Sequence, residues 1–265
     1  MRCKTCQFKR SVRIISAVAQ SGKAGINIET PLLTSETYLY IEPFNMKKYQ
    51  IILLFVFGIL ITLWAVGRLT NSFQYLKSQT KSNEPTYKSG TYFLASNLIT
   101  PKRFDFICYE VNEPDIEKQM WFHRICGMPG DTLEIRNGDL FVNGINQDLS
   151  LNLKKEYDIP YQLATALDFD EGDAIRIPGT DSIYVLLETI NHKDLIQQAR
   201  RHLRREEVDP MIQKIYGRPW TANNFGPYIV PADAYFVMGD NRNRSQDSRY
   251  LGPVKKDKMV ATVIR

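Results

Sequence analysis

The sequence lacks a second cysteine pair that could complete a metal site with its single Cys-x-x-Cys motif. Its four cysteines are Cys3, Cys6, Cys108 and Cys126, and the first two stand alone in a polar stretch. Because a structural zinc site needs four such ligands, we expect no metal here and no other cofactor. Cys108 and Cys126 each have apolar neighbours, which favours two buried thiols over a disulfide.

Dense clusters of basic residues are also scarce, although the formal net charge is +5. The basic residues are scattered except for a run at residues 200–205. Proteins that bind nucleic acid present concentrated basic surfaces, so we expect no nucleic-acid partner. With 265 residues and 43% hydrophobic content, the chain can bury one good core and a smaller second lobe.

Long apolar runs are limited to one, at residues 51–69, which carries no charge before Arg68. A helix of about 20 apolar residues crosses a hydrocarbon core of roughly 30 Å. Residues 64–67 offer a poor cleavage site, which favours an uncleaved anchor over a removed secretory signal. Basic residues flank both ends of the run, so charge does not orient the helix.

The residues before this run show neither a helical nor a strand period. A second methionine, Met46, directly precedes Lys47, Lys48 and the apolar run. Two alternatives follow for residues 1–45: translation starts at Met46, or these residues form a cytoplasmic tail.

The densest group of polar side chains lies at residues 235–254, where a strand-like apolar run ends in a Gly-Asp-Asn-Arg turn at Gly239. Glycine suits a tight turn, and Asp and Asn tolerate left-handed angles. Asp247 and Arg249 are two residues apart, so in extended backbone they point the same way and can pair. The string GDNRNRSQDSRYLG resembles the last conserved box of the bacterial type I signal peptidase family, GDNRxxSxDSRxxG, and matches every fixed position.

A second resemblance to this family begins at Ser82, where SNEPTYKSGT is similar to the nucleophile box SMxPTLxxGD. The matching residues are Ser82, Pro85, Thr86 and Gly90. Two residues depart from the pattern: Asn83 replaces methionine and Thr91 replaces aspartate. The methionine helps to line the substrate cleft in the family, so Asn83 bears on the specificity of the cleft more than on the chemistry.

Two further boxes lie between these motifs. KRFDFICYEV, at residues 102–111, reads as a strand similar to the family's RGDVVVF, with Phe104 in the glycine place. WFHRICGMPGDTLEIRNGDLFVNG, at residues 121–144, resembles KRxxGxPGDxxxxxxGxxxxNG. In this box His123 replaces the general-base lysine of the bacterial enzymes, whereas the related archaeal and endoplasmic-reticulum signal peptidases have histidine there.

The resemblance implies a serine protease site in which Ser82 is the nucleophile and His123 is the base. A serine hydroxyl is a weak nucleophile until a base accepts its proton. Imidazole, with an unperturbed pKa of about 6.5, needs little tuning for that task. We therefore expect activity to fall below a pKa of about 6 to 7, where protonated His123 is no longer a base.

Other residues of the boxes are assigned supporting roles. A histidine base usually needs a third group to fix its tautomer, and either Asp247 or Asp240 could serve. Asp247 is also expected to pair with Arg249, and Ser245 occupies the place of the residue that hydrogen-bonds the lysine in the family. The oxyanion hole would combine the backbone N–H of Ser82 with the hydroxyl of Thr80. Apolar strands around residues 93 and 121 could pair with an extended substrate.

The expected fold is mainly β: an antiparallel β catalytic core with an inserted α/β cap, preceded by one transmembrane helix. Strands are predicted at residues 133–135, 140–142, 183–187 and 234–238. A helix is predicted at residues 194–208, ended by Pro210, with arginines that are either solvated or in contact with anionic lipid headgroups. The predicted parts are a tail or misassigned start (1–45), an anchor (46–69), a linker (70–81), a first core segment (82–144), an inserted cap (145–230) and a second core segment (231–265).

The resemblance implies a single-pass protein of the cell membrane that removes N-terminal signal peptides from exported preproteins, with its catalytic domain outside the cytoplasm. Its expected partners are secretory preproteins and membrane lipids. The alternative is a catalytically inactive homologue that binds secretory chains or partners. A regulator of the LexA type shares the catalytic fold but lacks such an anchor, and the DNA-binding helices of that type are absent here.

Overall fold

A computed structural model describes residues 47–70, 72–113, 116–165, 167, 169, 172–203 and 207–264. These residues form mainly antiparallel β-sheets, as the sequence predicts. Residues 1–46, and with them Cys3, Cys6 and the choice between Met1 and Met46, lie outside the described residues.

The apolar run forms helix α1, Lys48–Leu69. No side chain of this helix is buried within the chain, and its large apolar residues are exposed along its length. Its length and composition suffice to cross a membrane. The helix predicted at residues 51–69 is therefore confirmed.

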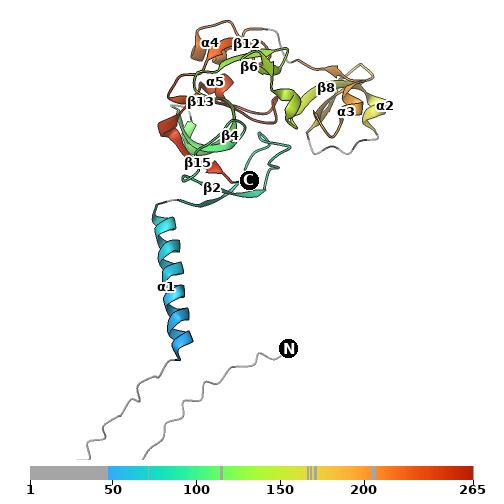
Figure 1. The fold of residues 1–265 in the computed structure, drawn as a ribbon. Coiled ribbons are helices and arrows are strands. Elements are labelled where there is room, and N and C mark those ends of the chain that lie inside the picture. The colour runs from blue at the N-terminus through green and yellow to red at the C-terminus, as the bar shows by residue number, and fades with distance from the viewer. Residues whose placement is uncertain are drawn as a thin grey trace, which may run out of the picture. The chain divides into compact units, whose positions relative to one another are not determined.

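The largest sheet has seven strands in the order β1-β2-β15-β3-β4-β13-β14. Their bounds are β1 Gln74–Lys77, β2 Tyr92–Ser96, β3 Phe106–Glu113, β4 Ile116–Gly127, β13 Ala234–Met238, β14 Val254–Lys255 and β15 Met259–Val263. The last strand, β15, lies beside β2 (Figure 1) and pairs with β3 on its other edge, with Val263 opposite Ala95 and Thr262 opposite Ile107. The two ends of the catalytic core thus meet in one sheet, which brings the first and last motifs together.

A four-stranded sheet in the order β12-β5-β6-β7 adjoins this core. Its strands are β5 Thr132–Arg136, β6 Asp139–Val142, β7 Ile145–Asn146 and β12 Phe225–Ile229. Leu133, Leu140 and Phe225 from this sheet pack with Phe236 of β13 in one buried apolar cluster. Helix α4, Pro210–Tyr216, adds Ile212 to the cluster.

Local sequence fixes the ends of α4. The Asp209 carboxylate accepts the backbone N–H groups of Met211 and Ile212, at 2.9 and 3.2 Å, and Pro210 occupies the first turn, where no donor is needed. Gly217 ends the helix with a left-handed φ of 63°. Helix α5, Ser248–Leu251, contacts α4 and lies within the last motif, near its end.

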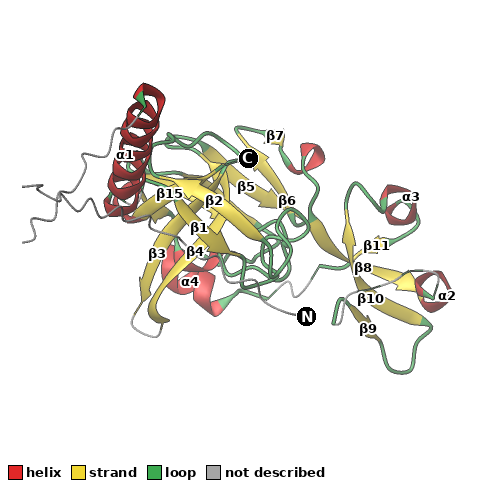
Figure 2. Ribbon diagram, turned by 90° about the horizontal axis from the view of Figure 1, so that it is seen from below, coloured by secondary structure: helices red, strands yellow, loops and turns green. Residues whose placement is uncertain are grey.

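The third sheet, in the order β11-β8-β10-β9, has its own apolar cluster. Its elements are β8 Lys154–Pro160, α2 Tyr161–Ala164, β9 Ala174–Arg176, β10 Ser182–Glu188, α3 Lys193–Ile196 and β11 Arg200–Arg201. Helices α2 and α3 lie beside this sheet (Figure 2). Two 3-10 turns, Asp148–Ser150 and Lys256–Lys258, complete the described elements.

The four predicted strands are confirmed as parts of β5, β6, β10 and β13. The helix predicted at residues 194–208 is wrong, because α3 ends at Ile196 and Arg200 and Arg201 form β11. Arg200 and Arg201 pair with Asp158 and Tyr157 of β8, so tertiary pairing outweighs the helical period. Arg204 and Arg205 lie outside the described residues. The lipid contact suggested for these arginines therefore also lies outside them.

Cys108 and Cys126 are both free thiols, fully buried as the sequence predicts. Burial raises the pKa of each thiol to about 12. At neutral pH both therefore pack as small apolar groups.

Candidate functional site

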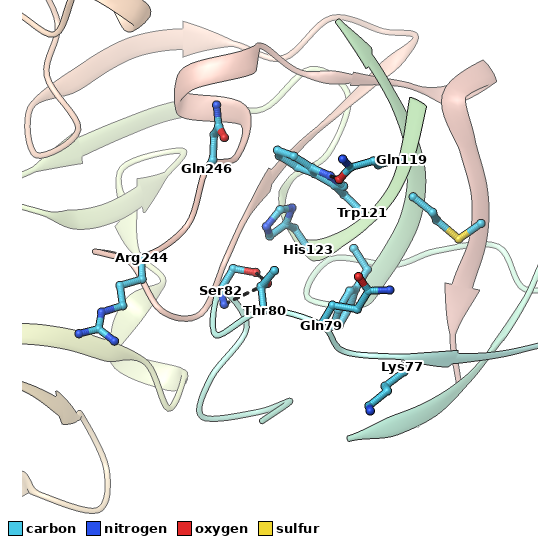
Figure 3. Close-up of a pocket in the computed structure, with 11 residues that line it drawn as sticks. Lys77, Gln79, Thr80, Ser82, Gln119, Trp121, His123, Arg244 and Gln246 are labelled. Atoms are coloured by element: carbon cyan, nitrogen blue, oxygen red, sulfur yellow. Dashed lines mark hydrogen bonds between the residues drawn. The ribbon is translucent and has the colours of Figure 1, made fainter. Parts of the chain in front are cut away.

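Three segments that are distant in sequence surround one cavity of about 290 Å³. They are residues 77–82, residues 119–123 of β4, and the loop that carries Arg244 and Gln246 (Figure 3). Ser82 and His123 both line this cavity. The fold therefore brings together the two residues that the motifs nominate for catalysis.

Ser82 lies in the loop that follows β1, and its hydroxyl forms a hydrogen bond with the hydroxyl of Thr80. Its Oγ lies 2.8 Å from Oγ1 of Thr80, and its backbone N–H donates to the same Thr80 oxygen at 3.4 Å. The two groups expected to form the oxyanion hole are thus adjacent. The carbonyl of Ser82 accepts the N–H of Asn241 at 3.0 Å, which ties the serine to the last motif.

Gly239 is required at this junction because the backbone of the last motif approaches the serine closely. A Cβ at position 239 would lie 2.4 Å from the Ser82 carbonyl oxygen and 2.3 Å from Oγ of Ser245, closer than atoms can approach. The N–H of Gly239 donates to Asp247 at 3.0 Å. The glycine of the motif therefore sets the spacing between the turn and the serine.

His123 is 3% exposed on β4, and its two ring nitrogens have different surroundings. Nδ1 lies 2.8 Å from the hydroxyl of Tyr109. Nε2 is buried and has no hydrogen-bond partner among the described residues. Tyr109 lies on β3, where Ile107 stands opposite His123 and Tyr109 stands opposite Trp121. The tyrosine is thus the diagonal neighbour of the histidine on the same face of the sheet.

Burial governs the protonation of both members of this pair. It lowers the pKa of His123 to about 4, an effect that Asp247 opposes and Arg249 assists. Burial, with the charge of Asp247, also raises the pKa of Tyr109 well above its usual range. At neutral pH His123 is therefore neutral and Tyr109 protonated. The fall in activity predicted below a pKa of about 6 to 7 is accordingly expected near pH 4 instead.

The carboxylates proposed to orient His123 have other hydrogen-bond partners. Asp240 accepts Nε and Nη2 of Arg124 at 2.7 and 2.5 Å, and the hydroxyl of Thr86 at 2.5 Å. Asp247 accepts Nε and Nη2 of Arg249, both at 2.9 Å.

We expected a carboxylate to form a hydrogen bond with His123. In the structure the hydroxyl of Tyr109 forms the hydrogen bond with Nδ1 of His123 instead. Burial would raise the pKa of Asp247, but Arg249 holds it below its usual range. Asp247 therefore stays ionised and acts on His123 through its charge.

Ser245 and Arg249 also have defined places. The Ser245 hydroxyl is buried with no partner among the described residues, and it packs against Gly239 rather than donating to the base. Nη2 of Arg249 donates to the carbonyl of Arg242 at 2.9 Å, in addition to its pair with Asp247. The pairing of Asp247 with Arg249 expected from the motif is present in the structure.

Buried lysines could offer a competing base, and the described residues include two, Lys154 and Lys155. Lys154 pairs with Glu84 and Asp173, which raise its pKa against the opposing effect of burial. Lys155 pairs with Asp139 and Asp148. Neither lysine is among the residues that line the cavity. His123 is the buried titratable group that faces Ser82 there.

Asn83 does not line the cleft, contrary to the expectation for the methionine that it replaces. Its side chain is fully buried, and Nδ2 donates to the carbonyl of Phe122 at 2.6 Å. Because Asn83 follows Ser82 and Phe122 precedes His123, this bond links the serine loop to the strand that carries the histidine. Sequence reasoning missed both this role and that of Tyr109.

The remaining motif residues stabilise turns and do not line the cavity. Asp131 pairs with Arg103 at 2.7 Å and accepts Nδ2 of Asn143 at 2.9 Å. Phe104, in the family's glycine place, has a φ of 71°, a conformation that glycine adopts more readily. Phe104 precedes β3, so the strand expected at residues 102–111 begins only at Phe106.

Of the two strands suggested for pairing with a substrate, β4 has part of an edge that the described strands leave unpaired. Both edges of β2, which carries Phe93, are occupied by β1 and β15. In β4, the pairing with β13 covers Arg124 to Gly127, while residues 119–123 line the cavity. That edge of β4 is therefore open to an extended peptide.

Replacing Tyr109 by phenylalanine is expected to lower kcat by about tenfold to a hundredfold and to change KM little. The variant leaves Nδ1 of His123 without its partner, and loss of one buried hydrogen bond costs about 1–3 kcal/mol. Steady-state kinetics measure the changes in kcat and in KM separately. Tyr235→Phe is the matched control, since Tyr235 belongs to the same apolar cluster as Tyr109. An unchanged kcat in Tyr109→Phe would show that this bond does not position the base.

Comparison with known proteins gives one family. The model of the family "Signal peptidase, peptidase S26" matches residues 48–265. The chain is 24% identical over 259 residues to a signal peptidase I of Buchnera aphidicola subsp. Baizongia pistaciae, covering 84% of this chain and 80% of that protein. It is 28% identical over 187 residues to a signal peptidase I of Bacillus caldolyticus, covering 69% and 72%. A crystal structure of a signal peptidase I from Enterococcus faecalis V583 matches at 23% identity and a TM-score of 0.31, covering 63% of this chain and 98% of the other.

Proposed function

Because the chain belongs to the signal peptidase family, peptidase S26, we propose that it is a membrane-anchored serine endopeptidase that cuts signal peptides from exported preproteins with Ser82 and His123. The observation that carries this proposal is that Ser82 and neutral His123 line one cavity. In this proposal the base is histidine in place of the lysine of the bacterial pattern. Signal peptidase activity itself accords with relatives of that name over most of the chain.

In the proposed reaction Ser82 exchanges its Thr80 partner for His123. The Ser82 oxygen attacks the carbonyl carbon of the scissile bond while Nε2 of His123 takes the hydroxyl proton. His123 then returns that proton to the leaving amine, and the acyl-enzyme is hydrolysed when a water gives its proton to the same nitrogen. Nε2 can act so only if Nδ1 carries the ring proton and donates it to the Tyr109 oxygen.

The developing oxyanion would be held by the Ser82 backbone N–H and the Thr80 hydroxyl. Each such donor is typically worth about 3 kcal/mol in the transition state. The substrate would lie extended along the open edge of β4 at residues 119–123, which directs its scissile carbonyl toward Ser82. Asp247 would stabilise the imidazolium that forms, since its charge raises the pKa of His123.

Purified full chain in detergent, incubated with a preprotein, tests this function. Mass spectrometry of the products should show one cut, at the junction between the signal peptide and the mature protein. If the protein binds the preprotein but leaves it intact in the presence of detergent and lipid, the non-catalytic alternative is correct.

The proposed topology makes a separate prediction. Signal peptides are removed on the far side of the membrane, so the domain after α1 is expected outside the cytoplasm and the segment before α1 inside. Protease added to intact spheroplasts should therefore degrade the domain, as followed with an antibody to it. Complete protection until the cells are lysed would place the domain in the cytoplasm.

A further inference from the structure

A second, smaller cavity of about 100 Å³ lies behind the catalytic turn and is lined by three arginines, Arg201, Arg242 and Arg249. None of the described residues that line it is an aspartate or a glutamate. It shares no lining residue with the cavity of Ser82 and His123. Three guanidinium groups thus line the cavity, and they favour an anion there to the extent that neighbouring carboxylates leave their charge uncompensated.

Two of these arginines have donors that other described residues do not satisfy. Nε and Nη2 of Arg242 and Nε of Arg201 are buried without a hydrogen-bond partner in the described part of the chain. Arg242 is only 5% exposed. Buried guanidinium donors without acceptors are costly, because their solvation is lost without replacement.

The carboxylates near the cavity are already shared among its cations. Asp148 pairs with both Arg242 and Lys155, at 2.8 and 2.7 Å. Asp247 pairs with Arg249. Arg201 instead lies over the ring of Tyr157, with 5.3 Å between its Cζ and the ring centroid.

The surrounding field reflects this excess of positive charge. Burial lowers the pKa of Lys155, and Arg201 and Arg242 lower it further, against the opposing charges of Asp148 and Asp139. Arg242 and Arg249 each have a carboxylate partner, Asp148 and Asp247. Arg201 has no carboxylate partner among the described residues. A ligand that brings negative charge and acceptor oxygens would satisfy both needs.

We infer that this cavity binds a small inorganic oxyanion of the phosphate or sulfate class, held by Arg242 and Arg201. Guanidinium groups bind such anions through paired N–H···O bonds, and the volume suits a free ion rather than a larger ester. The site bears on catalysis through the backbone. Arg242 follows Asn241, whose N–H holds the carbonyl of Ser82, and the carbonyl of Arg242 is itself held by Arg249. A bound anion therefore stabilises the turn on which the serine rests.

Thermal unfolding of the full chain in detergent tests the inference, with inorganic phosphate or sulfate substituted for chloride at constant ionic strength. Saturating anion is expected to raise Tm by about 3 °C or more in the wild type. Arg201→Gln should remove most of this rise, because it removes one guanidinium from the cavity without breaking an ion pair.

Arg200→Gln is the matched control, since Arg200 is the exposed neighbour on the same strand and does not line the cavity. It should keep the full rise in Tm. The Ser82→Ala variant should keep it too, so the result does not depend on the proposed catalysis. An equal rise in wild type and Arg201→Gln would reveal a general salt effect, and no rise in the wild type would mean that the cavity takes only water. Either outcome overturns the inference.

Discussion

Ser82→Ala is expected to abolish preprotein cleavage, with a fall in kcat of at least about 10³-fold, as for other serine proteases that lose the nucleophile. The hydroxyl of Ser82 faces the cavity that His123 lines, next to the Thr80 hydroxyl. Alanine keeps the backbone N–H and the carbonyl that Asn241 holds. The variant should therefore fold and bind substrate while losing the reaction.

Two other serines separate this result from a general effect of mutation. Ser89 is exposed in the same loop, and Ser89→Ala should retain activity. Ser96 is buried and donates to the carbonyl of Ser72 at 2.6 Å, so Ser96→Ala should lose stability but not the reaction. Single-turnover cleavage, measured beside Tm, distinguishes the two effects. Full activity in the Ser82→Ala protein would assign the nucleophile elsewhere.

Loss of the His123 imidazole is expected to lower kcat by about 10³-fold or more, because His123 is the buried titratable group among the described residues that line the cavity, whereas Lys77 there is exposed. The two buried lysines are held by carboxylates away from the cavity. His123→Ala would also leave a hole beside Tyr109 and Trp121.

His123→Gln is the better matched change, since its amide fills more of the space and can still bond to Tyr109. Both variants should be inactive, and only His123→Ala should lose much stability. His123→Lys is expected to recover little, because an ammonium group at this site would have to lose its charge to act as a base. An active His123→Gln enzyme would show that the histidine is structural.

The motifs singled out two residues, Ser82 and His123, that line one cavity, because each motif specifies a local backbone conformation and the fold brings these segments together. Ser82 and His123 are distant in sequence, yet both could be named from the residues around them. Strands also followed from local sequence: β13 is a short apolar run buried on both faces, and the first residues of β10 alternate between buried and partly exposed. The spacing of residues within one segment predicts turns and strands, because these structures depend mainly on residues that are close in sequence.

Tyr109 could not be named in this way, because its role depends on register. Only the pairing of β3 with β4 sets it diagonally from His123, and a shift by one residue would turn it to the other face. The bond from Asn83 to Phe122 likewise requires two segments to meet. Sequence reasoning assigned the histidine a carboxylate partner by analogy, whereas Asp240 and Asp247 are taken by buried arginines.

The helix predicted at residues 194–208 failed for a similar physical reason. Leu195 and Ala199 have a helical spacing, but both pack in the apolar cluster of the third sheet while the chain returns along β8 as β11. The cation–π contact of Arg201 with Tyr157 supports the strand. Propensity is a weak guide where a sheet edge is available to be paired.

The pH dependence of kcat/KM for the wild-type enzyme tests the Ser82/His123 pair most directly. Only the neutral imidazole can accept the serine proton, and burial lowers the pKa of His123 to about 4. The logarithm of kcat/KM is therefore expected to stay level from about pH 7 down to about pH 5, and to fall with unit slope below about pH 4. A rate that instead rises through about pH 8 to 9, as for a titrating lysine, would contradict the assignment of His123 as the base.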